Sequence, residues 1–143
     1  MHHTLAILAL ALAVSVGCAN GAKTKMSDDL TTCASLAECG ARDGKRIAVV
    51  GVYTPFSPMP NRKRDDDSPL PVRIVLGDGG GPLLAPYWHQ DAVRPADEVA
   101  RYAGKKVRVV GTFLGQSPPP PDPEAATLGG PCLHPIEKIE LAE

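Results

Sequence analysis

The chain has few aromatic residues and no excess of charge of either sign. Aromatic side chains make up 4% of its 143 residues, with a single tryptophan. A platform on which successive nucleic-acid bases could stack would therefore be sparse. The formal net charge is -1, whereas a protein that mainly grips phosphate backbones needs a basic face. Both shortages make a nucleic-acid partner unlikely.

The chain also lacks the residue patterns of common catalytic and metal sites. The glycines after Asp78 are not followed by Lys-Ser or Lys-Thr, so they indicate a hairpin turn rather than a phosphate loop. His89 and Asp91 have the residue types of an acid/base pair, but no nucleophile lies near them in the sequence. Cys132 and His134, taken with His89, lack the second close-spaced pair of strong zinc motifs. We therefore predict no enzyme activity, no cofactor and no metal.

The longest apolar run lies at the N-terminus. Residues 4–16 carry no charge, and the run is shorter than the roughly 20 residues of a membrane-spanning helix. Small residues follow it, as in a secretory signal peptide. The stretch VSVGC, from Val14 to Cys18, resembles the lipobox of bacterial lipoproteins. An ordinary signal peptide cut after Ala19 or Ala22 is the alternative.

The lipobox resemblance implies where in the cell the protein is located. Cys18 would become the lipidated first residue after removal of a signal peptide over residues 1–17, and its acyl chains would hold the protein to a membrane. Ala19 is not the aspartate that marks inner-membrane retention, which implies the outer membrane, facing the periplasm. Secretion is the alternative. Residues 18–29, mostly small and polar, are predicted to form a tether.

Three cysteines remain beyond the lipobox, and an exported protein permits disulfides. A helix is predicted over about residues 30–38. Six residues along a helix rise about 9 Å, too far for Cys33 to reach Cys39 unless the helix ends before Cys39. Cys39 just precedes the first strand predicted below and Cys132 the last, and the barrel that this strand order resembles would place both strand starts at the same end. We therefore expect a disulfide between Cys39 and Cys132, with Cys33 as the alternative partner of Cys132.

One sequence pattern occurs twice, sixty positions apart, as GKRIAVVGVY from Gly44 and GKKVRVVGTF from Gly104. Both copies alternate apolar and other residues, which predicts two matched β-strands. A glycine midway along each strand, Gly51 or Gly111, would let the sheet bend. The side chains predicted to point inward are Ile47, Val49, Gly51 and Tyr53 in the first copy and Val107, Val109, Gly111 and Phe113 in the second.

The remaining elements complete the domain over residues 30–143. Strands are predicted at 72–76, 82–88 and 136–141. Between the third and fourth strands, Pro95 begins a helix whose predicted buried face is Ala96, Val99, Ala100 and Ala103. The strand order β-β-β-α-β-β resembles that of the OB-fold, an all-β, five-stranded Greek-key barrel with one helix. Another small barrel or sandwich is the alternative.

The OB-fold resemblance also implies where a ligand binds. OB barrels usually bind across the second and third strands, between the first-to-second and fourth-to-fifth loops. Both of those loops are long and proline-rich here. Packing in the core is the alternative for Trp88. The candidate ligand-binding residues are Arg73, Tyr87, Trp88 and His89, with Arg62, Lys63 and Arg64 from the first loop.

Together these patterns predict a membrane-anchored, non-enzymatic OB-fold lipoprotein of the bacterial cell envelope. Its expected role is that of a binding or accessory module for an envelope protein or an oligosaccharide. A protein that binds single-stranded nucleic acid, as many OB-folds do, and a small secreted enzyme are the alternatives.

Overall fold

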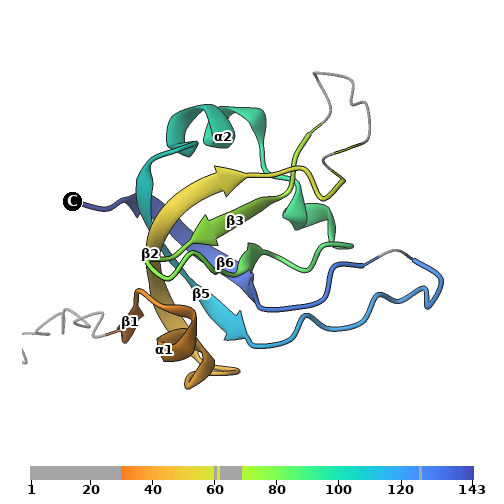
Figure 1. The fold of residues 1–143 in the computed structure, drawn as a ribbon, viewed down its shortest axis with the longest axis horizontal. Coiled ribbons are helices and arrows are strands. Elements are labelled where there is room, and N and C mark those ends of the chain that lie inside the picture. The colour runs from red at the N-terminus through yellow and green to blue at the C-terminus, as the bar shows by residue number, and fades with distance from the viewer. Residues whose placement is uncertain (1–29, 60, 62–68, 126) are drawn as a thin grey trace, which may run out of the picture.

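The computed structural model describes residues 30–59, 61, 69–125 and 127–143 (Figure 1). The predicted signal peptide, Cys18, the tether and the loop residues Arg62, Lys63 and Arg64 lie outside the described residues. The elements, in chain order, are β1 (Thr32–Cys33), α1 (Leu36–Gly40), β2 (Arg46–Pro55), β3 (Val72–Val75), β4 (Leu83–Leu84), the 3₁₀ turn η1 (Gln90–Ala92), α2 (Ala96–Tyr102), β5 (Lys106–Leu114) and β6 (Cys132–Leu141).

Five strands close into a barrel. The strand order is β1-β2-β3-β4-β6-β5, and β5 also pairs with β2, which closes the ring from β2 to β6. The β4–β6 pair is parallel, and the other pairs within the ring are antiparallel. β1 adds to β2 in parallel from outside the ring. The prediction of an all-β, OB-like barrel is confirmed.

The two copies of the repeated pattern form β2 and β5, which lie side by side. They pair antiparallel from Arg46 opposite Thr112 to Val52 opposite Lys106. The side chains predicted to point inward are buried on both strands, and Tyr53 and Phe113 are among the largest fully buried side chains. The repeat therefore has a structural role, because its two copies form neighbouring strands that line the same hydrophobic core.

Gly51 and Gly111 lie where the backbone of a neighbouring strand approaches closely. A Cβ on Gly51 would overlap the carbonyl oxygen of Val75 and lie 2.7 Å from Cγ2 of Ile74. A Cβ on Gly111 would lie 2.7 Å from the carbonyl oxygen of Pro135, and the β5–β6 register shifts on both sides of Gly111. Any side chain at either position would push the adjoining strand away.

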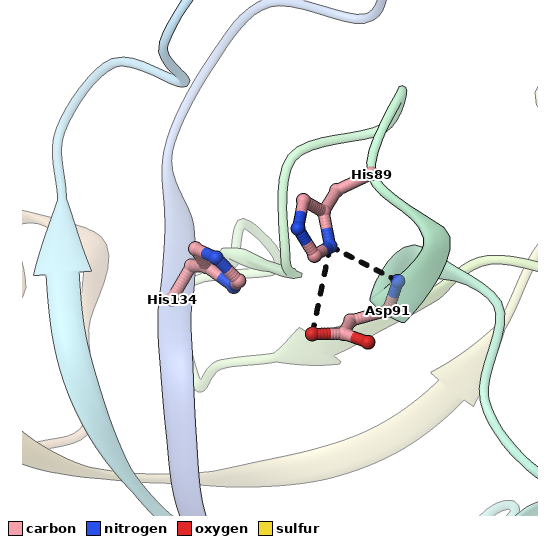
Figure 2. Close-up of side chains that lie close together, drawn as sticks. All are labelled: His89, Asp91 and His134. Carbon is pink, nitrogen blue, oxygen red and sulfur yellow. Dashed lines mark hydrogen bonds and ion pairs between the residues drawn. The ribbon is translucent and has the colours of Figure 1, made fainter.

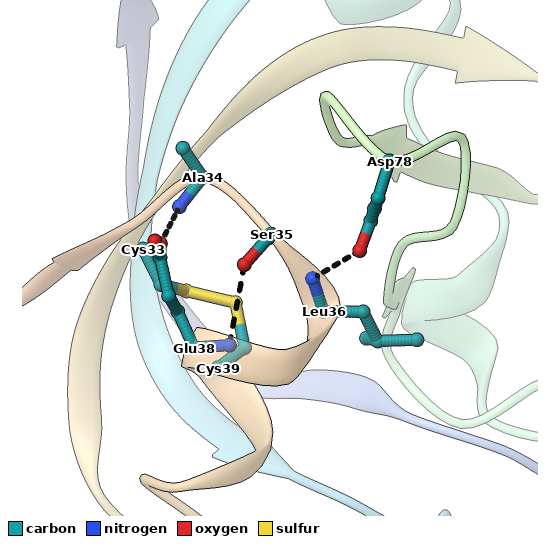
Figure 3. Close-up of a disulfide and its surroundings, with 7 residues drawn as sticks. All are labelled: Cys33, Ala34, Ser35, Leu36, Glu38, Cys39 and Asp78. Atoms are coloured by element: carbon teal, nitrogen blue, oxygen red, sulfur yellow. Dashed lines mark hydrogen bonds between the residues drawn. A yellow bond between two sulfur atoms is a disulfide. The ribbon is translucent and has the colours of Figure 1, made fainter.

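The predicted helix over residues 30–38 is wrong in its boundaries. The chain first forms β1, and α1 begins only after Ser35. The Ser35 hydroxyl accepts a hydrogen bond from the backbone N–H of Glu38 (3.3 Å), and the Glu38 carboxylate accepts one from the N–H of Ala34 (2.9 Å) (Figure 3). Two backbone donors are thus satisfied reciprocally at the start of the helix, so a capping box sets the boundary.

The expected disulfide between Cys39 and Cys132 is also wrong, as is the alternative between Cys33 and Cys132. Cys33 is bonded to Cys39, with 5.4 Å between their Cα atoms (Figure 3). Cys33 lies on a strand and Cys39 on the helix that follows, so the chain reverses between them and the rise along one helix does not apply. Cys132 is a buried free cysteine at the start of β6.

The buried face of α2 differs from the predicted one. Ala96, Ala100 and Ala103 are exposed, whereas Tyr102 is buried and Val99 half-buried. The Tyr102 ring packs against that of Tyr53, 5.8 Å between centroids, and its hydroxyl donates to the carbonyl oxygen of Ile139 (3.1 Å). Burying a tyrosine ring removes far more apolar area from water than burying an alanine, and this difference sets the rotation of the helix.

The third strand is shorter than predicted and the last is longer. β4 ends at Leu84, because Ala85 has a φ of 80°, in the left-handed region that a strand cannot use. The chain then leaves the barrel, which places Tyr87 and Trp88 in a turn rather than at a strand end. β6 starts at Cys132 instead of residue 136, and its first residues pair with β4.

Candidate functional site

Three connections meet at one side of the barrel, which we call the loop end. They are the described parts of the β2–β3 loop, the segment 85–95 around η1, and the described parts of the β5–β6 loop, all to the right in Figure 1. An isolated β-bridge joins Pro71 of the first to Val93 of the second. The Trp88 indole N–H donates to the carbonyl oxygen of Pro118 in the third (2.8 Å). The segment 85–95 therefore ties the other two together.

The predicted ligand-binding residues within the described part of the chain fall into two groups. Tyr87, Trp88 and His89 are consecutive and half-buried at the loop end. Arg73 is exposed on β3, opposite Leu83 of β4, and its guanidinium carbon lies 5.2 Å from the centroid of the Phe56 ring. The stacking holds the arginine side chain against the barrel wall and leaves its donors available.

Trp88 combines the two roles that the sequence left open. Its indole nitrogen is already used to hold the β5–β6 loop, and its ring meets the edge of the His89 ring, with 5.6 Å between centroids. The residue is nevertheless only half-buried. Trp88 thus positions the loop end and still offers part of its surface to a partner.

The structure gathers His89, Asp91 and His134 into one cluster (Figure 2). Nδ1 of His89 accepts a hydrogen bond from the backbone N–H of Asp91 (3.1 Å) and lies 3.5 Å from its carboxylate oxygen Oδ2. The rings of His89 and His134 are 4.5 Å apart between centroids. One ligand atom from each residue lies within 4.8 Å of the other two.

The surroundings of the cluster favour a neutral imidazole at His134. Partial burial lowers the pKa of His134, and the neighbouring His89 lowers it further, while the charge of Asp91 acts in the opposite direction. The two rings come from different parts of the fold. His89 is the N-cap of η1, and His134 lies on β6.

The sequence singled out His89 and Asp91 but grouped His134 with Cys132. In the structure Cys132 is buried, and Asp91 is the third member of the cluster instead. The missed signal was the parallel pairing of the third and fifth OB strands. With Leu84 opposite Leu133, residue 134 comes beside the segment that follows β4. The predicted absence of a metal site remains a prediction.

A second polar network fixes α2 to the barrel. Arg94 donates two hydrogen bonds of 2.8 Å to the Glu98 carboxylate, and the hydroxyl of the buried Tyr53 donates a third, also of 2.8 Å. Burial would raise the pKa of Glu98, but the bonds from Arg94 and Tyr53 outweigh it and hold the pKa below its usual value. Burial, followed by the bond to Glu98, raises the pKa of Tyr53. These groups satisfy one another, so their role is structural.

An open groove of about 610 Å³ runs between α2 and β6. Its walls carry charges of both signs, and several of these are paired in ion pairs within the groove or at its edge. No charge of one sign dominates it. Its lining residues are Arg94, Asp97, Glu98, Arg101, Tyr102 and residues 136–139.

Comparisons with known proteins give no indication of function, so any functional proposal rests on the residues of the site. No protein-family model matches the chain, no curated protein is significantly similar to it, and no solved structure gives a significant match. Within the described part of the chain, none of the helices has the length and apolar character needed to cross a membrane.

Proposed function

We propose that this chain is a lipid-anchored, non-enzymatic binding protein of the bacterial cell envelope. Its barrel presents the loop end to an envelope protein or an oligosaccharide. The observation that carries the proposal is that the segment 85–95, which contains the half-buried Tyr87 and Trp88, is joined to both long loops, through Val93 to Pro71 and through Trp88 to Pro118. In OB barrels these loops flank the ligand-binding position.

The chemistry of the loop end suits such a partner. Half-buried aromatic rings can bury apolar area against a sugar ring or an apolar side chain. The entropic cost is small for Trp88, because its indole nitrogen is already held by Pro118. Arg73, held by Phe56, keeps donors for a carboxylate or a hydroxyl group. The near-zero net charge does not favour binding to a phosphate backbone.

The non-enzymatic part of the proposal rests on the sequence, which carries none of the catalytic motifs considered above. The lipid anchor rests on the resemblance of the stretch ending at Cys18 to a lipobox. Mass spectrometry of the mature protein tests the anchor. An acylated Cys18 is expected at the N-terminus, and an unmodified start at Ala19 or beyond would contradict it.

The binding role is tested with the full chain as bait, against detergent-extracted bacterial envelopes and against an array of envelope glycans. Arg73→Ala is compared with Arg101→Ala, since both remove an exposed arginine but only Arg73 lies on the predicted binding face. We expect a partner from one of the two sources whose affinity falls roughly tenfold or more in Arg73→Ala, as when a central interface residue is truncated. A loss confined to Arg101→Ala would place the partner in the α2–β6 groove instead, and an equal loss in both variants would contradict the proposed face.

A further inference from the structure

We propose that His89, Asp91 and His134 form a binding site for a divalent transition-metal ion, with Zn²⁺ as the ion that the donors suit best. The inference goes beyond the proposed function and does not depend on it, because it rests on the cluster alone. It would add a metal to a loop end proposed above to bind a macromolecule.

The donor set is the first argument. Two imidazole nitrogens and one carboxylate oxygen are ligands that Zn²⁺ and its neighbours in the first transition row accept readily. Three protein ligands leave a fourth position of the zinc tetrahedron for water or for a group of a partner. The single carboxylate partly offsets the double charge of the ion.

The spacing is the second argument. Ligand atoms about 2.1 Å from a tetrahedral ion lie roughly 3.4 Å from one another. Nδ1 of His89 and Oδ2 of Asp91 already stand at 3.5 Å. The three ligand atoms, one from each residue, all lie within 4.8 Å of one another, so the remaining gap to be closed is at most about 1.4 Å. A rotation of the half-buried His134 ring supplies a movement of that size without a shift of the backbone.

The third argument is that the cluster is held in shape before any ion arrives. His89 and Asp91 belong to one short turn, in which Nδ1 of His89 receives the backbone N–H of Asp91. The lone pair of Nδ1 is therefore directed toward Asp91, and an ion bound there would replace a single N–H as its partner. His134 approaches from a strand of the barrel, which provides a rigid base (Figure 2).

The positive charge of Arg94, which contacts the backbone of Asp91, does not oppose the site. Arg94 donates to the backbone carbonyl of Asp91 (3.3 Å), but its guanidinium is paired with the carboxylate of Glu98 through two hydrogen bonds. Its charge is therefore largely neutralised on the side of α2. A bound ion would join the segment 85–95 to β6 and so fix the orientation of Tyr87 and Trp88.

The test is a metal titration of the full chain, kept in detergent under conditions that leave the Cys33–Cys39 disulfide intact. Zn²⁺ is the probe, and Co²⁺ is its coloured substitute. We expect one tightly bound ion per chain and a rise in the unfolding temperature with Zn²⁺. His89→Gln and His134→Gln should each weaken binding roughly 100-fold or more, because even partners outside the ligand shell are worth 10–100-fold. In the presence of Zn²⁺, both variants should unfold at the temperature at which the unchanged protein unfolds without metal.

Two control variants separate this site from other metal ligands of the chain. His2 and His3 are its only other histidines and lie in the predicted signal peptide, so the double variant His2→Gln/His3→Gln, made in the unprocessed chain, should bind Zn²⁺ as the unchanged unprocessed chain does. Cys132→Ser should leave the Co²⁺ spectrum unaltered, because the thiol is buried away from the cluster residues named here. The proposal is overturned if the full chain takes up no Zn²⁺, if His89→Gln binds it undiminished, or if the control variants lose it. Should His134→Gln fail to fold, His89→Gln decides the question, because His89 lies outside the barrel strands.

Discussion

Replacing Gly51 with alanine should destabilise the protein far more than one methyl group ordinarily does. The added Cβ would overlap the carbonyl oxygen of Val75 and stand 2.7 Å from Cγ2 of Ile74. Real Cβ contacts essentially never fall below 3.0 Å, so β2 and β3 would have to separate at the point where their pairing begins. Overpacking of this kind costs typically 1–3 kcal/mol, and the contact with rigid backbone places Gly51→Ala at the upper end, about 3 kcal/mol.

The assay is urea unfolding followed by circular dichroism, with the free energy of unfolding extrapolated to water. Gly40→Ala is the matched control, because a Cβ on Gly40 would meet no atom within 4 Å. It should leave the stability unchanged or raise it by up to about 1 kcal/mol, since alanine favours the helix. A Gly51→Ala variant within about 0.5 kcal/mol of the unchanged protein would refute the reasoning that close strand approach makes this glycine necessary.

Three further outcomes are expected. Replacing both Cys33 and Cys39 with serine should lower the free energy of unfolding by about 2 kcal/mol, the chain-entropy value for a loop closed over six positions, and an unchanged value in denaturant titration would contradict it. Because the pKa of Glu98 is lowered in the folded protein, its contribution to stability is complete above the pKa of this group in the unfolded chain and is lost as the pH falls through the lower folded value. Glu98→Gln should therefore weaken the fall of the unfolding free energy at acid pH, and an equally steep fall in the variant would contradict the reasoning. Single-stranded DNA should give no gel shift at low salt with protein on the order of 50 µM, and a shift would revive the nucleic-acid alternative.

The strands of the repeated pattern could be predicted because their signal is local. Alternation fixes which side chains of each copy point inward, and Gly51 and Gly111 mark the bends. The barrel order then follows from the sequence of strands, with the single helix between the third and the fourth. The strands themselves needed only short-range pattern, whereas their arrangement into a barrel came from the resemblance of their order to the OB-fold.

The errors arose where two local signals competed. The predicted start of the first helix relied on Ser27, Asp28 and Asp29 as capping residues in the sequence. The Ser35–Glu38 pair offers a later start, and its hydrogen bonds determine the boundary in the structure. That later start places Cys33 on a strand, which reversed the disulfide prediction. In α2 the alanine periodicity was a weaker signal than the single large ring of Tyr102.

The cluster of His89, Asp91 and His134 could not be assembled from spacing along the chain. Its members come together only because β4 and β6 pair in parallel, a contact between residues far apart in the sequence. Residue type identified the candidates, while topology decided which of them meet.

The most direct test of the binding role places a photo-crosslinking residue at position 87, at the loop end, or at position 101, on α2, in the full chain expressed in bacteria. The account predicts that a specific envelope partner is crosslinked from position 87 and not from position 101. Crosslinking from position 101 alone, or no specific product from position 87 under conditions where the chain reaches the envelope, would contradict it.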